Sequence, residues 1–164
     1  MPPDSKLVQL ARELLDIAKE NLQRDKELVP VALMIDDDYQ IIGIEGITFK
    51  THDEKAAAFQ GVIEKARELE AMAIVTISDM FQKKFENVQQ MSEYVGTYSS
   101  GDLARDHTGE LIELTVTGPS VESYSITQSY VRQTPEMIVF TNMSESTNFD
   151  FPLLEGWIRR PLVQ

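Results

Sequence analysis

Three residues in this sequence have the types and spacing expected of a catalytic site: Asp79, Glu113 and His107. Asp79 directly follows the apolar run at 73–78, where we expect the strand to end, and His107 lies in the expected flap. Glu110 is the alternative to Glu113 as the second carboxylate. A carboxylate in a cleft can act as a general acid or base, and catalytic groups often lie where a strand ends beside an insertion. This pattern predicts a small hydrolase or a metal-assisted enzyme. The alternative is that Asp79 caps a following helix while His107 is a solvated loop residue.

The sequence lacks the residues that most other kinds of catalytic site require. The chain has no cysteine, and its two histidines, His52 and His107, are not at the spacing of metal ligands. It has neither a phosphate-binding glycine motif nor a nucleophile elbow. The triplet Asp36–Asp38 lacks the pattern of a calcium loop and fits a turn held by local hydrogen bonds. We therefore expect no cofactor and no metal, and we favour a protein that is not an enzyme.

The charge of the chain bears on its partners. Fifteen basic and 27 acidic side chains give a formal net charge of -12, which disfavours binding to nucleic acid. The acidity either keeps the protein soluble or, as a further hypothesis, imitates DNA and inhibits a DNA-binding protein. With neither a secretory leader nor a membrane-spanning run, the sequence suggests a cytoplasmic protein that does not associate with membranes.

The elements that must position these residues follow from hydrophobic periodicity. A capped amphipathic helix is expected from Asp4 or Ser5 to about Arg24, and a second from the capping box Thr51–Glu54 to about Ala71. Period-two patterns and β-branched runs bounded by turn residues predict six strands. The expected strands are 31–35, 41–47, 73–78, 111–117, 121–132 and 137–141.

One of these strands has two distinct faces. Ser123, Ser125, Thr127 and Ser129 alternate with Tyr124, Ile126 and Tyr130, so one face carries hydroxyls and the other is apolar and aromatic. A solvated sheet face explains the hydroxyls, and a polar ligand or a partner surface is the functional alternative.

The order of elements predicts a single α+β domain spanning residues 1–164. We expect a mostly antiparallel sheet of about five to six strands, with two main helices packed on one face. Residues 79–109 are the expected insertion or flap. The apolar segment within 142–164 should pack back on the sheet or form a contact between subunits.

The run from Ala66 through Ala73–Phe81, in which a helix leads directly into a strand, resembles a group of small uncharacterised bacterial proteins. Asp79 and Phe81 stand where that group has glutamate and tryptophan. The resemblance supports the order of the elements and implies no activity.

Taken together, these features favour a non-enzymatic interaction or accessory domain with a possible protein partner. The preferred form is a homodimer that associates through an exposed strand or through Phe149–Ile158.

Overall fold

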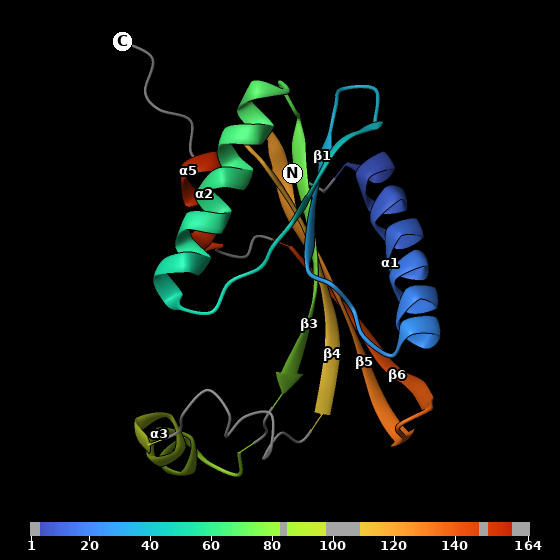
Figure 1. Cartoon of the computed structure of the whole chain (residues 1–164), viewed down its shortest axis with the longest axis vertical. Coiled ribbons are helices and arrows are strands. Elements are labelled where there is room, and N and C mark those ends of the chain that lie inside the picture. Colours follow the sequence, from blue (N-terminus) through green and yellow to red (C-terminus); the bar gives the residue numbers. More distant parts are fainter. Residues whose placement is uncertain (1–3, 83–84, 98–108, 148–150, 159–164) are drawn as a thin grey trace.

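The computed structural model describes residues 4–82, 85–97, 109–147 and 151–158. Its helices surround one central sheet (Figure 1). In chain order the elements are α1 (Ser5–Asp25), β1 (Val31–Ile35), β2 (Ile41–Gly46), α2 (His52–Glu68), β3 (Ala73–Gln82), α3 (Val88–Thr97), β4 (Gly109–Gly118), β5 (Val121–Thr134), β6 (Met137–Thr147), the 3-10 turn η1 (Pro152–Leu154) and α5 (Glu155–Ile158).

The six strands form one sheet in the order β2-β1-β3-β4-β5-β6, and every neighbouring pair is antiparallel. The prediction of an α+β domain with a mostly antiparallel sheet is therefore confirmed. Because β2 and β3 both run antiparallel to β1, they are parallel to each other, and α2 connects them across β1. Strands β3 to β6 then follow one another as a simple meander.

The two main helices lie on opposite faces of this sheet, so the expectation of two helices on one face is wrong. We call these the α1 face and the α2 face. The buried stripe of α1 packs with Leu33, Val75 and Leu114, whereas α2 packs with Ala32, Met34 and Ile74. Figure 1 shows the sheet between the two helices. Successive residues of β1 and β3 point to opposite faces and are apolar on both, so each face of these central strands needs a cover.

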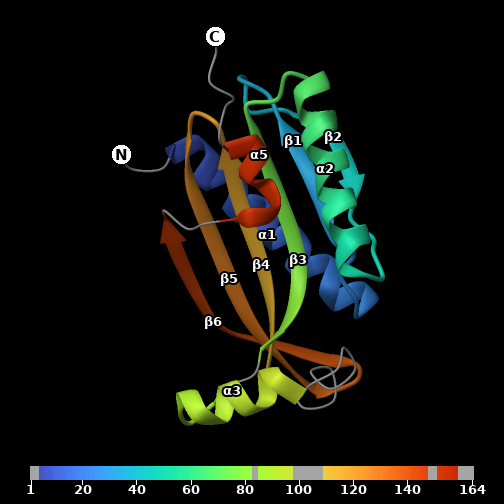
Figure 2. The same ribbon diagram turned by 90° about the vertical axis from the view of Figure 1, so that its left-hand side faces the viewer.

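Neither helix covers the whole of its face. On the α1 face, the side chains of Ile41 and Ile44 in edge strand β2 remain 44% and 65% exposed. On the α2 face, α2 and α5 lie over one part of the sheet and leave β5 and β6 uncovered (Figure 2). The uncovered area beside β2 is apolar, and the uncovered area over β5 and β6 is polar.

Local sequence signals fix where both main helices begin. The Asp4 carboxylate accepts hydrogen bonds from the backbone N–H groups of Lys6 and Leu7, at 2.9 and 3.3 Å. The Thr51 hydroxyl accepts from the Glu54 N–H at 3.1 Å, and the Glu54 carboxylate accepts from the Lys50 N–H at 2.6 Å. Both predicted caps are thus present, with Glu54 bonding to the residue before the cap.

The described part of the C-terminal segment packs on its own chain. Leu154 and Trp157 are 0% and 4% exposed and belong to the core beneath α2. The indole Nε1 of Trp157 donates to the backbone carbonyl of Thr117 at 3.2 Å, and the ring of Phe151 meets Phe59 edge to face. These contacts favour closure within one chain over a subunit contact through this segment.

The buried position of Trp157 gives a simple test, since it is the only tryptophan in the chain. We expect blue-shifted fluorescence emission, as from an apolar environment, that does not change when the native protein is diluted. Emission that moves to the red on dilution, with far-ultraviolet circular dichroism unchanged, would instead show that a second subunit buries this residue.

The turn between β4 and β5 tolerates no side chain at Gly118. A Cβ at this position would lie 2.5 Å from the backbone carbonyl oxygen of Met72, whereas a Cβ on Gly46 would meet nothing within 4 Å. We expect Gly118→Ala to lower the free energy of unfolding by about 1–3 kcal/mol, because backbone must move to relieve the overlap. The matched variant Gly46→Ala should change it by less than about 0.5 kcal/mol. Urea denaturation compares the two, and equal midpoints would contradict the tight approach at Gly118.

Candidate functional site

The sequence predicted Asp79 at the end of a strand, but the structure places it inside β3. β3 continues to Gln82 and pairs with β4 along this length, with Asp79 opposite Ile112 and Phe81 opposite Glu110. Ile77, Asp79 and Phe81 therefore lie on one face of the continuing strand, and Asp79 does not cap a helix. Asp79 consequently projects from the α1 face of the sheet, as do its neighbour Ile77 and its cross-strand partner Ile112.

The predicted catalytic residues do not converge. Glu113 pairs with Ser78, one position out of phase with Asp79, so the two carboxylates project from opposite faces of the sheet. His107 lies outside the described residues. A catalytic site that needs Asp79 and Glu113 together is therefore not formed in this fold.

The carboxylate that does lie near Asp79 is Glu110, which the sequence offered as the alternative to Glu113. Glu110 lies diagonally across from Asp79 on the α1 face and directly opposite Tyr130. Arg132 pairs with Glu110, with 3.0 Å between the arginine Nε and a carboxylate oxygen, and its guanidinium lies 5.8 Å from the centre of the Tyr130 ring. Asp79, Glu110, Tyr130 and Arg132 thus form one cluster at this end of the sheet.

Electrostatics sets Asp79 apart within the cluster. Burial raises the pKa of Asp79 above the usual aspartate value, and the charge of Glu110 adds to this shift. A hydrogen bond from the backbone N–H of Asp79 and the charge of Arg132 oppose the shift. Burial, together with the charges of Glu110 and Asp79, raises the pKa of Tyr130 to about 12, and the nearby guanidinium of Arg132 opposes this shift. The Tyr130 hydroxyl is buried and makes no hydrogen bond of normal geometry with any residue that the structure describes.

Glu113 has a different environment on the α2 face. A row of polar side chains crosses four strands there, formed by Ser78, Glu113, Thr127 and Ser144. The hydroxyls of Thr127 and Ser144 bond to each other at 2.6 Å. Burial raises the pKa of Glu113, and the positive charge of Lys55 opposes the shift. The predicted hydroxyl-rich face of β5 is thus confirmed. Its predicted apolar face is confirmed as well, because Tyr124, Ile126 and Tyr130 belong to the core on the α1 face.

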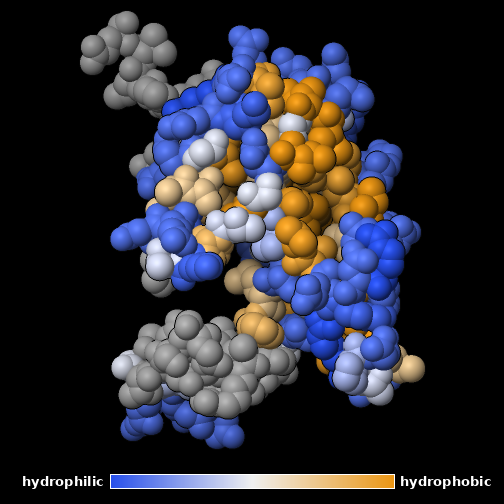
Figure 3. Space-filling model, viewed as in Figure 1, coloured by the Kyte–Doolittle hydropathy of each residue, from blue (hydrophilic) through white to orange (hydrophobic). Residues whose placement is uncertain are grey.

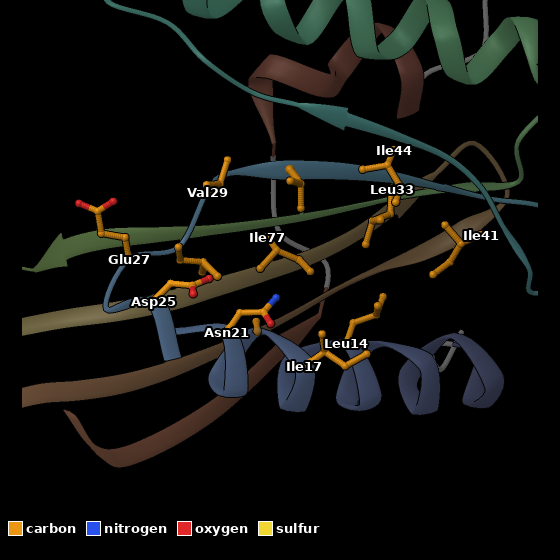
Figure 4. A pocket seen from close by; sticks show the side chains of 13 residues that line it. Leu14, Ile17, Asn21, Asp25, Glu27, Val29, Leu33, Ile41, Ile44 and Ile77 are labelled. Carbon is orange, nitrogen blue, oxygen red and sulfur yellow. The ribbon is translucent and has the colours of Figure 1, made fainter. Parts of the chain in front are cut away.

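The uncovered part of the α1 face forms a groove between α1 and β2, with a volume of about 380 Å³. We call it the α1–β2 groove. Four of its aliphatic side chains are largely exposed: Ile17 (51%), Val29 (64%), Ile41 (44%) and Ile44 (65%). Figure 3 shows apolar surface gathered between β2 and α1, and Figure 4 shows Ile17 facing Ile41 and Ile44 across the groove. The sequence placed Ile41 and Ile44 in a strand without revealing that no helix covers them.

One end of the α1–β2 groove is acidic. Asp25 and Glu27 line it there, and Figure 4 shows both beyond Asn21 at the C-terminal end of α1. Ile77 lines the groove, and Asp79 follows on the same face of the same strand. The charge of Glu27 reaches Asp79 and raises its pKa. The groove therefore leads from an apolar surface toward the Asp79 cluster.

Comparisons with protein-family models, with curated proteins and with solved structures found no match to this chain. The resemblance to small bacterial proteins stays a prediction. Within the described ranges there is no group of three or more histidine, aspartate or glutamate side chains placed to hold a metal ion. No described helix combines the length and apolarity needed to span a bilayer.

The raised pKa of Glu113 has a consequence for stability. Because the folded chain holds this proton more tightly than the unfolded chain does, the residue lowers stability as the pH rises from the usual glutamate pKa through the raised one. We expect Glu113→Gln to raise the urea midpoint at neutral pH relative to the native protein, and the difference to shrink as the pH falls. The exposed carboxyl of Glu64 provides the control Glu64→Gln, for which no such pH-dependent gain is expected. An increase in the urea midpoint of Glu113→Gln that is equally large at neutral pH and at a pH below the usual glutamate pKa would contradict the burial argument.

Proposed function

We propose that this protein is a non-enzymatic interaction domain whose α1–β2 groove binds an amphipathic helix of a partner protein. The observation that carries the proposal is the groove itself, in which four exposed aliphatic side chains gather around one concave surface. Fully burying a side chain of this size contributes about 1.5–3 kcal/mol. Contiguous exposed apolar surface of this kind is typical of binding sites, whereas single exposed apolar residues are not.

The shape of the groove supports a helix as its occupant. On the α1 face, α1 covers the central strands and leaves the side next to β2 bare. Packed helices lie about 8–10 Å apart, so a second helix beside α1 would complete the layer over the sheet. Such an occupant would contact Ile17 from one side and Ile41 and Ile44 from below.

Charge indicates the chemistry of the partner. The polar groups that line the groove are Asn21, Asp25 and Glu27, and the chain as a whole carries a formal charge of -12. A partner helix with basic residues beside its apolar face would be drawn to this surface and oriented on it. A second copy of this chain would bring the same negative charge and is the less favoured occupant.

Dimerisation through an exposed strand remains a separate prediction. The dimer route through the C-terminal segment loses support because Leu154 and Trp157 are buried within their own chain.

Two synthetic peptides test the groove: a basic amphipathic helix made of leucine and lysine, and a scrambled peptide of the same composition that has no apolar face. We expect fluorescence anisotropy to show saturable binding of the first peptide alone. Ile44→Glu or Ile17→Glu should weaken binding by about tenfold or more, because each introduces a charge into the apolar surface. Met137→Glu is the matched control, since Met137 is 52% exposed but lies in the β5–β6 hairpin.

Equal affinity for the two peptides, or an equal effect of all three variants, would contradict the proposal and indicate attraction by net charge alone. Light scattering on the free protein provides the remaining comparison. A dimer that Ile44→Glu dissociates would assign the groove to a second copy of the chain instead.

A further inference from the structure

We propose that Asp79 and the Tyr130 hydroxyl, with Glu110 beside them, form a binding site for a primary ammonium group. In the complex proposed above, this group would be the side chain of a lysine on the partner helix. The identity of that lysine rests on the proposed function, whereas the site itself does not and can be tested with a free amine.

The first observation is an imbalance of charge. The charges of Glu110 and Glu27 both act on Asp79, and the guanidinium of Arg132 opposes them. Arg132 is already committed to Glu110, at 3.0 Å. Asp79 receives no hydrogen bond from a side chain in the described part of the chain, although it is half-buried. A half-buried carboxylate without a counter-ion is costly, and a bound cation would remove that cost.

The second observation is independent of the carboxylates. The side chain of Tyr130 is 1% exposed, and its hydroxyl has no hydrogen-bond partner of normal geometry among the described residues. Tyr130 lies directly opposite Glu110 on the same face of the sheet, so its ring borders the acidic cluster. A buried hydroxyl normally finds a partner, because leaving it unsatisfied destabilises the folded state. The oxygen of this hydroxyl can accept a hydrogen bond from an incoming N–H donor.

These groups suit an ammonium ion better than a second guanidinium. An ammonium is compact and has three donors, which can reach a carboxylate and a neighbouring hydroxyl oxygen from one point. Glu110 is already occupied by a planar guanidinium that also lies over the Tyr130 ring. The remaining acceptors are the carboxylate of Asp79 and the single oxygen of Tyr130, which lie on different side chains and suit a compact donor that can reach both.

The location of the cluster connects it with the α1–β2 groove. Ile77 lines the groove and Asp79 is the next residue on the same face of β3. A helix lying in the groove with a lysine near this end would place its alkyl stem along apolar surface and its charge at Asp79. Asp79 would then fix the register and direction of the partner.

A titration with n-butylammonium chloride, followed by the amide NMR shifts of Asp79 and Tyr130, tests the site without any partner. n-Butanol and sodium chloride at equal ionic strength are the matched solutes. We expect saturable shifts with the amine alone. Asp79→Asn should weaken binding at least tenfold, whereas Asp38→Asn, in the exposed β1–β2 loop, should leave it unchanged.

Tyr130→Phe keeps the ring and removes the unpartnered hydroxyl, so it should fold at least as stably while binding the amine several-fold more weakly. Binding should also fall as the pH drops through the raised pKa of Asp79, with Glu110, Glu27 and Arg132 as the charged groups that face it. Shifts that are scattered over the acidic surface, or that persist in Asp79→Asn, would overturn the proposal.

The two proposals fail separately. If the amine binds at Asp79 but the basic peptide does not bind in the groove, the ammonium site stands and the interaction function falls. If the peptide binds equally well after the single lysine at the Asp79 end of the groove is replaced by uncharged norleucine, and the amine does not bind, the ammonium site falls while the groove remains.

Discussion

The constraint on which the whole structure depends is that the central strands β1 and β3 are apolar on both faces. Ala32, Met34 and Ile74 project from one face, while Leu33, Val75 and Ile77 project from the other. Exposing either set would leave several large aliphatic side chains in water, at about 25 cal/mol for each square ångström of apolar surface. The chain must therefore supply a helix to each face, and α1 and α2 meet this need from opposite sides.

The way in which the helices meet that constraint determines which parts of the sheet stay exposed. α1 packs against the middle of the sheet on its face and leaves the β2 side open, whereas α2 and α5 leave β5 and β6 open on the other. The two open areas differ in composition. On the α2 face the open strands carry hydroxyls that bond to one another across the strands, as in the pairs Ser125–Ser146 and Thr127–Ser144, and this surface is stable in water. On the α1 face the open surface is aliphatic, and its side chains form no hydrogen bonds with water.

Much of the fold could be predicted from short-range patterns. The buried stripe of α1, the caps at Asp4 and Thr51, and the alternation along β5 depend on neighbours within a few residues. The arrangement of the helices about the sheet depends on contacts between distant residues. The uninterrupted apolar run Val31–Ile35 was nevertheless a signal of burial on both faces, because a strand with one wet face alternates.

The candidate site shows the same division. Asp79 was identified from its position after an apolar run, but its neighbours depend on how far β3 pairs with β4. Pairing that extends to Gln82 brings Glu110 to the side of Asp79 and sends Glu113 to the opposite face. A shift of one residue in this register would exchange the two glutamates. Sequence alone does not specify that register, so it offered both glutamates without deciding between them.

The environment of Asp79 argues against a purely structural role. Carboxylates that stabilise this fold have partners: Asp4 caps α1 and accepts from Tyr39 at 2.7 Å, and Glu145 accepts from Tyr124 at 2.6 Å while pairing with Arg12. A tyrosine hydrogen bond is the largest cause of the lowered pKa of Asp4 and of Glu145; backbone N–H groups add to it for Asp4, and Arg12 adds to it for Glu145. Asp79 shows the opposite shift, and it lies near the acidic end of the α1–β2 groove, beside a buried hydroxyl that has no hydrogen-bond partner of normal geometry among the described residues. Under the proposed function, the counter-charge that Asp79 lacks among the described residues would come from the bound ammonium group.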